Sequence, residues 1–137
     1  MRPESGQQPG TRPEQARVFF ALWPPPESAR YLADVAGSFA ARAGGRAIRQ
    51  EAIHLTLAFL GDVAVERLPD LERATREVLC EAFALTLDRF GLWRHNRIFQ
   101  AGCSVPPAAL AGLAAALAAA LPAAGFAAAD ARRTFIP

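Results

Sequence analysis

Residues 104–129 contain no charged side chain, and this stretch decides which class of fold the chain can adopt. It is long enough to span a bilayer, but most of it is alanine, which drives membrane insertion only weakly compared with leucine or phenylalanine. Its leucines recur at helical spacing along one face: Leu110, Leu113, Leu117 and Leu121. Pro122 and Gly125 then interrupt the run. We therefore expect an alanine-rich helix of a soluble protein, which packs through its leucines and does not cross a membrane.

The overall composition indicates one globular domain of modest size. The chain has 137 residues, of which 52% are hydrophobic and 20% charged, so it can form a core and is not disordered throughout. Its formal net charge of +2 is too small for a protein that neutralises many phosphates along a duplex. If the substrate is RNA, this composition favours contact with an RNA end or a single nucleotide.

The N-terminal residues and the cysteines bear on the domain boundary and on the compartment. Residues 1–16 are polar and contain prolines but no apolar segment typical of a signal peptide, so we expect a disordered tail there. Cys80 and Cys103 lie far apart and form no CxxC pair, which favours buried free thiols in a reducing cytoplasm. We expect a cytoplasmic protein whose folded domain covers residues 17–137.

Turn and cap residues divide this domain into strands and helices. The expected elements are a strand over 17–23, a helix over 27–43 between Pro24-Pro25-Pro26 and Gly44, a strand from about 48 or 53 to 60, a helix over 65–80, strands over 84–90 and 97–104, and the helix after Pro106-Pro107. Residues 91–96 would connect the last two strands. This order predicts an α+β fold, in which helices pack outside mostly antiparallel strands.

Residues 53–61, Ile-His-Leu-Thr-Leu-Ala-Phe-Leu-Gly, carry the strongest chemical signal. They form a short apolar run rich in strand-forming residues, and Gly61-Asp62 is a turn signal that would close the strand. Because side chains alternate along a strand, His54 and Thr56 would project from one face and Leu55 from the other. An imidazole that exchanges protons then stands beside a hydroxyl that can donate a hydrogen bond to an anionic oxygen. Such a pair suits the chemistry of phosphate esters.

Three stretches of the chain together carry a family likeness. They are Val18–Pro24 and His54–Gly61, and then Trp93–Phe99 with Pro106, Leu110 and Leu113. They resemble the start and the middle of bacterial RNA 2',3'-cyclic phosphodiesterases, also called 2'-5' RNA ligases, of the two-histidine phosphoesterase superfamily. The resemblance implies a two-lobed α+β fold and hydrolysis of RNA 2',3'-cyclic phosphate ends to 2'-phosphomonoesters. The reverse reaction, ligation of RNA ends through a 2'-5' bond, is open to the same site.

The chain departs from this family pattern at its C-terminal end. Members carry a second His-x-Thr motif, preceded by a Phe-x-Pro segment and followed by an arginine. Here Phe135-Ile136-Pro137 resembles that lead-in, and the printed sequence then stops. The other histidine, His95, is followed two positions later by Arg97 and not by threonine. The resemblance thus implies a phosphoesterase domain without its C-terminal part, and leaves a fragment, an early stop and a frameshift open.

The resemblance assigns roles to His54 and Thr56, and residue type adds further candidates. His54 would donate the proton to the leaving 3' oxygen, and Thr56 would contact the phosphate. Phe19 is a candidate for stacking on a nucleobase, with core packing as its ordinary alternative. Arg97 is a candidate phosphate contact, with a solvated surface position as its alternative. His95 is expected to be structural or exposed.

Cofactors and partners follow from the same reading. No metal or other cofactor is expected, since two isolated histidines and two isolated cysteines do not make a zinc site. The expected partners are RNA 2',3'-cyclic phosphate ends or cyclic nucleotides, and we expect a monomer that does not bind membranes. Three alternatives stay open: a relative that acts on another cyclic phosphodiester, a catalytically impaired module that binds RNA ends, and an inactive truncated homologue.

Overall fold

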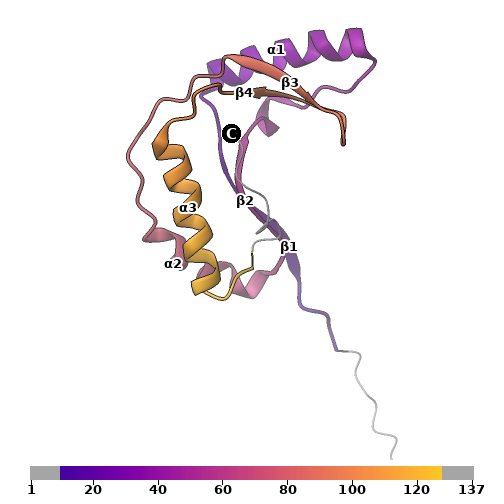
Figure 1. Cartoon of the computed structure of the whole chain (residues 1–137). Coiled ribbons are helices and arrows are strands. Elements are labelled where there is room, and N and C mark those ends of the chain that lie inside the picture. The colour runs from indigo at the N-terminus through magenta and orange to yellow at the C-terminus, as the bar shows by residue number, and fades with distance from the viewer. Residues whose placement is uncertain (1–9, 128–137) are drawn as a thin grey trace, which may run out of the picture.

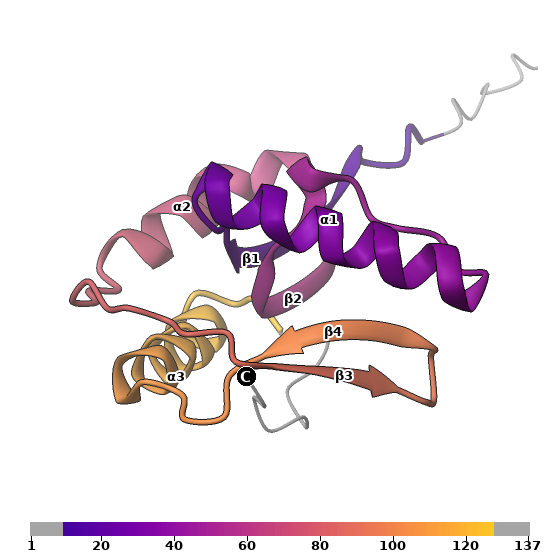
Figure 2. The same ribbon diagram turned by 90° about the horizontal axis from the view of Figure 1, so that it is seen from above.

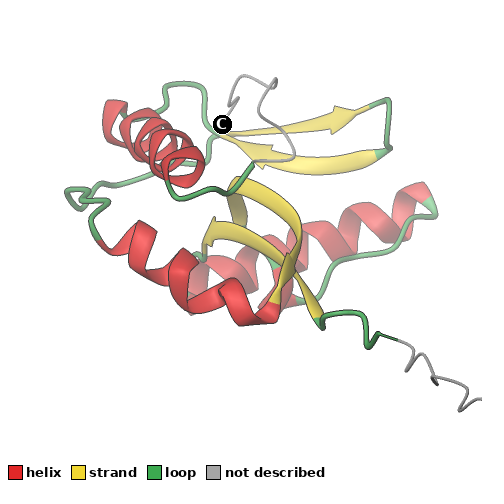
Figure 3. Cartoon of the chain, turned by 90° about the horizontal axis from the view of Figure 1, so that it is seen from below, coloured by secondary structure: helices red, strands yellow, loops and turns green. Residues whose placement is uncertain are grey.

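The structure is a computed structural model that describes residues 10–127. Within these residues, two antiparallel sheets of two strands each are surrounded by α-helices (Figure 1). The elements are β1 (Gln15–Leu22), α1 (Pro26–Ala43), η1 (Gln50–Ala52), β2 (Leu55–Ala64), η2 (Val65–Arg67), α2 (Leu68–Arg76), β3 (Arg89–Trp93), β4 (Ile98–Gly102) and α3 (Ala108–Ala123), where η marks a short 3₁₀ helix. The expected α+β fold, with antiparallel strands and helices on the outside, is confirmed (Figure 3).

The first sheet pairs β1 with β2 in antiparallel fashion. Its register runs from Gln15 opposite Ala64 to Leu22 opposite Leu55. Strand β1 therefore starts before the expected domain boundary at residue 17, while residues 1–9 lie outside the described part of the chain. The pairing of Leu22 with Leu55 has a consequence for the site, because it brings the residues that follow β1 next to those that precede β2.

The expected turn at Gly61-Asp62 is wrong, because β2 continues through it to Ala64. Gly61 has a φ of 76°, a left-handed conformation that glycine adopts without steric cost. The pairing register shifts at this point, and Leu60 is the extra residue of a β-bulge. The glycine therefore bends the strand instead of ending it.

Helix α1 begins and ends where the sequence predicts. Pro26 stands in its first turn. Backbone amides there have no intrahelical acceptor, so the amide hydrogen that proline lacks costs no hydrogen bond. At the other end Gly44 adopts a φ of 71°, and its amide donates to the carbonyl oxygen of Ala40. The helix over 27–43 is thus confirmed. After α1, the chain turns back through η1 to the start of β2.

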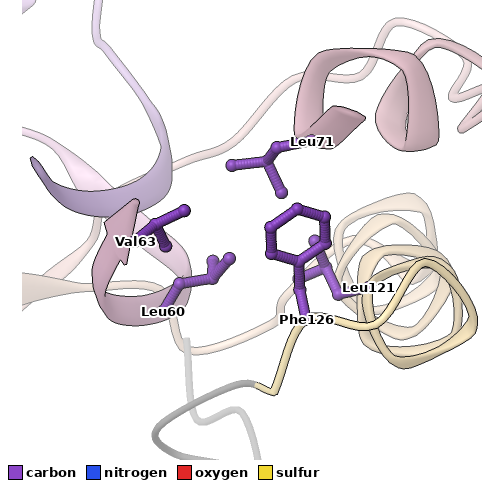
Figure 4. Packing of buried hydrophobic residues seen from close by; sticks show 5 residues of the cluster. All are labelled: Leu60, Val63, Leu71, Leu121 and Phe126. Atoms are coloured by element: carbon purple, nitrogen blue, oxygen red, sulfur yellow. The ribbon is translucent and has the colours of Figure 1, made fainter. Parts of the chain in front are cut away.

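Helix α3 packs through its leucines, as expected. Leu110 and Leu121 have no exposed surface, and Leu117 is also buried. Leu121 joins a core cluster built from β2, α2, α3 and the segment after α3: Leu60, Val63, Leu71, Leu121 and Phe126 (Figure 4). Within residues 10–127, no helix has both the length and the apolar character that crossing a membrane requires.

Helix α2 is shorter than the helix expected over 65–80. It ends at Arg76, and of the apolar residues that follow, Val78 is half-buried while Leu79 is 87% exposed. Cys80, which was expected to be buried, is exposed, because it lies beyond the end of α2 in a segment without helix or strand. Cys103 is buried as expected, and both thiols are free.

The second sheet starts further along the chain than expected. Strand β3 spans Arg89–Trp93, so the strand expected over 84–90 is wrong for residues 84–88, and residues 91–93 are strand and not connection. Strand β4 (Ile98–Gly102) lies within the strand expected over 97–104. The alternating pattern over 84–88 predicts a strand, but no strand of the described chain pairs with these residues.

Asp88 closes the base of this hairpin. Its amide donates to the carbonyl oxygen of Gly102 at 3.0 Å. Its carboxylate accepts hydrogen bonds from the Ser104 hydroxyl and from the Ser104 amide, the latter at 2.8 Å. These bonds hold the pKa of Asp88 below its usual value, and the bond from the Ser104 hydroxyl has the larger effect. Pairing of the two hairpin strands therefore begins here.

Candidate active site

His54 directly precedes β2, and Ile53 separates it from the 3₁₀ helix η1. That turn brings the carbonyl oxygen of Ala52 to 2.6 Å from Nδ1 of His54. A carbonyl oxygen can only accept, so Nδ1 carries the hydrogen, and Nε2 is the ring nitrogen left to exchange a proton with a ligand. The imidazole is exposed to solvent, so a ligand can reach it.

Thr56 follows on β2 and is exposed like His54, whereas Leu55 between them is half-buried. This alternation agrees with the expectation that His54 and Thr56 share one open face of the strand. The pairing register shifts directly after Thr56, where Leu57 is the extra residue of a second bulge. Bulges bend a strand and re-aim its side chains, and they are frequent beside active sites.

Two aromatic side chains lie against the imidazole, Phe19 of β1 and Trp23 directly after that strand. Phe19 stacks on His54 with ring centroids 5.0 Å apart and planes at 30°, and Trp23 lies 5.6 Å from the same ring. Phe19 is 38% and Trp23 57% exposed, so neither is a core residue and both can touch a ligand. We call His54, Thr56, Phe19 and Trp23 the His54 cluster.

A shallow pocket opens beside the His54 cluster. It has a volume of about 200 Å³ and is lined by Trp23, Pro24, Pro26, Ala29, Gln50, Glu51 and Ile53. Trp23 belongs to both the pocket and the cluster. Gln50 and Glu51 bring polar groups to the pocket, and the sequence analysis did not single them out. Only the position of η1 against the start of α1 makes them neighbours of Trp23, and no local pattern signals this.

Arg97, the remaining expected site residue, is not brought to this cluster. Arg97 and His95 lie in the turn between β3 and β4, both exposed. Among the described residues, no hydrogen bond, ion pair or ring contact joins either of them to His54 or Thr56. His95 stacks on Trp93 instead, with centroids 6.3 Å apart. The segment Phe135-Ile136-Pro137 lies outside the described residues.

The chemistry that this arrangement can carry out is proton exchange beside an anion. The imidazole supplies one acid–base group, the hydroxyl of Thr56 one hydrogen-bond donor, and Phe19 and Trp23 apolar ring faces. Residues 10–127 contain no cluster of three or more His, Cys, Asp or Glu side chains that could hold a metal ion.

The sequence profile of the family described as LigT like Phosphoesterase matches residues 22–99. That range contains His54 and Thr56 and reaches from the end of β1 into β4. The chain belongs to this family. The resemblance stated from the motif residues is thereby confirmed. A curated relative, the RNA 2',3'-cyclic phosphodiesterase of Escherichia coli (strain K12), is 34% identical over 101 residues, which cover 74% of this chain and 57% of that protein.

Solved structures agree with the fold. E. coli LigT in apo form matches with a TM-score of 0.79 at 31% identity, covering 90% of this chain and 69% of that one. E. coli LigT complexed with 3'-AMP matches with a TM-score of 0.76 at 31% identity, covering 90% and 70%. The chain therefore has the fold of these phosphoesterases. It aligns with less than two thirds of the length of the curated relative.

Proposed function

We propose that this chain carries the proton-donor half of a site that hydrolyses RNA 2',3'-cyclic phosphate ends to 2'-phosphomonoesters. The observation that supports this most is the exposed imidazole of His54, which Ala52 holds by Nδ1 at 2.6 Å with Nε2 free. The identity with a curated RNA 2',3'-cyclic phosphodiesterase supports the substrate class. We also propose that residues 17–137 belong to one phosphoesterase domain, in addition to the strand residues Gln15 and Ala16.

The proposed reaction breaks the bond between phosphorus and the ribose 3' oxygen. Water attacks the phosphorus, and the electron pair of the breaking bond goes to the 3' oxygen. His54, as the imidazolium, passes the hydrogen on Nε2 to that oxygen. The neutral ring that remains keeps its hydrogen on Nδ1, where the carbonyl of Ala52 already accepts it. The same hydrogen bond thus serves the ring before and after proton transfer.

The neighbours of His54 would stabilise and orient the phosphate end. The hydroxyl of Thr56 would donate a hydrogen bond to a non-bridging phosphate oxygen, where negative charge builds up. Phe19 and Trp23 would offer ring faces to the terminal nucleoside, since exposed aromatic side chains stack on bases without regard to sequence. The proposed scheme uses acid–base groups of the protein and no metal ion or other cofactor.

Activation of the attacking water needs a second acid–base group. The family resemblance assigns that role to a second His-x-Thr motif, and the 137 residues contain only one such motif. A general acid or base typically contributes about 10²–10⁴-fold. We therefore expect the 137-residue chain to hydrolyse cyclic phosphates more slowly than the E. coli relative by a factor of about this size. Ligation through a 2'-5' bond, as the reverse of the cleavage, would need the same two groups.

The test is hydrolysis of 2',3'-cyclic AMP and of an RNA with a 2',3'-cyclic phosphate end, with 2'- and 3'-monophosphate products separated by chromatography. We expect 2'-phosphate products, unaffected by a metal chelator. His54→Ala should remove the activity, and Thr56→Val should lower it about 10- to 100-fold, because a hydrogen bond to a charged group is lost. Thr56→Ser is the matched control, since it keeps the hydroxyl.

Two results would contradict this proposal. Equal turnover by His54→Ala and the unchanged chain would remove His54 from the chemistry. Binding of the RNA end without any turnover, with the same affinity after His54→Ala, would favour the alternative of a catalytically impaired RNA-end binding module.

A further inference from the structure

The hairpin of β3 and β4 carries more arginines than the acidic residue beside it can compensate. Residues 89–102 contain Arg89, Arg94 and Arg97 but no Asp or Glu. Asp88, at the base of the hairpin, lies next to Arg89 and offsets its charge, which leaves Arg94 and Arg97 of the turn without a nearby acidic residue in the sequence. Within residues 10–127, the ion pair found is that of Asp70 with Arg73 in α2, and none of the three hairpin arginines takes part in one.

Both faces of the hairpin carry apolar side chains. Phe99 of β4 stacks on Phe39 of α1 with centroids 3.9 Å apart and planes at 6°, so the face that carries Phe99 is turned to helix α1. Figure 2 shows the hairpin running alongside that helix. Trp93 and Ile98, paired with each other on the opposite face, are 44% and 47% exposed. Phe90 and Leu92, on the same face as Phe99, are 48% and 52% exposed, so apolar surface stays open on both faces of the hairpin, that of Trp93 included.

Trp93 is followed directly by the turn that carries two arginines. Trp93 stacks on His95 at 6.3 Å and 24°. Arg94 and Arg97 stand on either side of His95 in the four-residue turn between the strands. Aromatic faces interleaved with arginines are the combination that single-stranded nucleic acids bind, through base stacking and phosphate contacts.

Arg97 is held in a conformation that arginine does not favour. Its φ is 57°, whereas each other residue of the described chain with a positive φ is a glycine. Glycine or asparagine would fit this turn position with less strain. A charged side chain kept at such a position points to a use for that charge, since the fold alone would be better served by glycine.

We propose that the turn surface of Trp93, Arg94, His95 and Arg97 binds single-stranded RNA. It would hold the nucleotides that precede the cyclic phosphate end, with a base stacked on Trp93 and phosphates on Arg94 and Arg97. The hairpin lies beside the β1–β2 sheet in all three views (Figures 1 to 3), and His54 directly precedes strand β2 of that sheet. This inference rests on the proposed function and narrows its substrate to oligoribonucleotides over free cyclic mononucleotides.

The first test compares two ligands for equilibrium binding to the full chain: a fluorescein-labelled hexauridylate with a 3'-phosphate, and 3'-UMP. Arg94→Gln with Arg97→Gln should weaken hexauridylate binding about 60-fold at 50 mM salt and about 10-fold at 200 mM, and should lower the slope of log K against log salt by about 1.4. Binding of 3'-UMP should stay within about twofold. Arg12→Gln with Arg76→Gln removes the same charge outside the hairpin and should leave both affinities nearly unchanged.

The second test separates stacking from charge. Trp93→Ala should weaken hexauridylate binding about 5- to 150-fold, the range for loss of one stacked base. Trp93→Phe keeps a ring face and should recover most of that loss. Neither change should alter the slope against salt, because neither changes the charge.

Arg97→Gly separates RNA binding from folding. It removes the charge and also the backbone strain, so the unfolding temperature should stay the same or rise while hexauridylate binding weakens. If Arg97 had only a structural role, Arg97→Gly would leave hexauridylate binding unchanged at equal stability. If the unchanged chain binds 3'-UMP and hexauridylate but all hairpin variants bind hexauridylate as it does, this inference is overturned and the proposed function stands. If the unchanged chain binds neither ligand, the proposed function fails first.

Discussion

The carbonyl oxygen of Ala52 decides which nitrogen of His54 faces a ligand. It lies in a 3₁₀ turn whose amides are satisfied locally, Ala52 by Arg49 at 2.9 Å and Ile53 by Gln50 at 3.3 Å. The turn therefore presents its carbonyl to the next side chain in the sequence. A histidine with the same neighbours in a longer, unbroken strand would have no such acceptor. The orientation of the ring is thus a property of the backbone before β2.

Backbone conformation also matters at Gly61, and this leads to a stability prediction. Its φ of 76° makes alanine unfavourable, while an added Cβ would meet nothing closer than a Phe59 ring atom at 4.0 Å. The cost is therefore in the backbone, and Gly61→Ala should lower the free energy of unfolding by roughly 1–2 kcal/mol. Gly37→Ala is the control, because Gly37 lies in α1 with open space around it. It should raise stability by about 0.5–1 kcal/mol.

Denaturant unfolding of both variants measures this difference. A loss of stability for Gly61→Ala no larger than the experimental error would show that the bulge of β2 has another conformation in solution.

Among the elements, the end of α3 is joined to the start of α2 by one side chain. The Arg67 guanidinium donates to the carbonyl oxygens of Ala124 at 3.3 Å and of Gly125 at 3.5 Å, and it lies 4.2 Å from the centre of the Phe126 ring. A cation at the C-terminal end of a helix is favourable, and so is one over an aromatic face. Phe126 belongs to the core cluster, so Arg67 covers one end of that core.

Removal of this contact should destabilise the fold. Arg67→Ala should lower the free energy of unfolding by about 1–2 kcal/mol, since Arg67 is partly buried and its partners would be left to solvent. The matched control is Arg73→Ala, which breaks the exposed ion pair with Asp70 at 3.1 Å. That change should cost no more than about 0.5 kcal/mol. Equal effects of the two variants in thermal unfolding would mean that Arg67 does not hold the end of α3.

Helices whose ends or packing depend on residues close by in the sequence could be predicted from the sequence. The prolines before α1, Gly44 after it and the leucine spacing of α3 all act within a few residues, and all three predictions are confirmed. Strand β3 could not be placed, because residues 84–88 alternate as well as 89–93 do and only the pairing with β4 decides between them. The bulges of β2 are likewise a property of two strands together.

At the scale of the whole molecule, the candidate site is assembled from segments that are far apart in the sequence. His54 and Thr56 could be singled out because both lie in one motif, His54 directly before β2 and Thr56 on it. The rings of Phe19 and Trp23 reach them only because β1 and β2 are antiparallel and in register from Leu22 opposite Leu55. Arg97 was grouped with the site by residue type, yet it belongs to the other sheet.

The chain matches part of the length of its structural relatives. Its fold matches E. coli LigT structures over 90% of its residues, while the chain covers about 70% of those structures. The described part contains one exposed histidine flanked by aromatic rings and a second in the hairpin turn. The proposal assigns proton donation to the first and an RNA contact to the second, so the two histidines should respond to different ligands.

The most direct measurement follows the ring nitrogens of His54 by NMR while the chain is titrated with 3'-AMP. We expect the Nε2 signal of His54 to shift with added ligand, and the Nδ1 signal to remain that of a nitrogen bonded to hydrogen. The His95 signals should stay in place, because a single nucleotide does not reach the hairpin. Saturable binding of 3'-AMP that leaves both His54 nitrogens unchanged would contradict the claim that this imidazole stands at the phosphate.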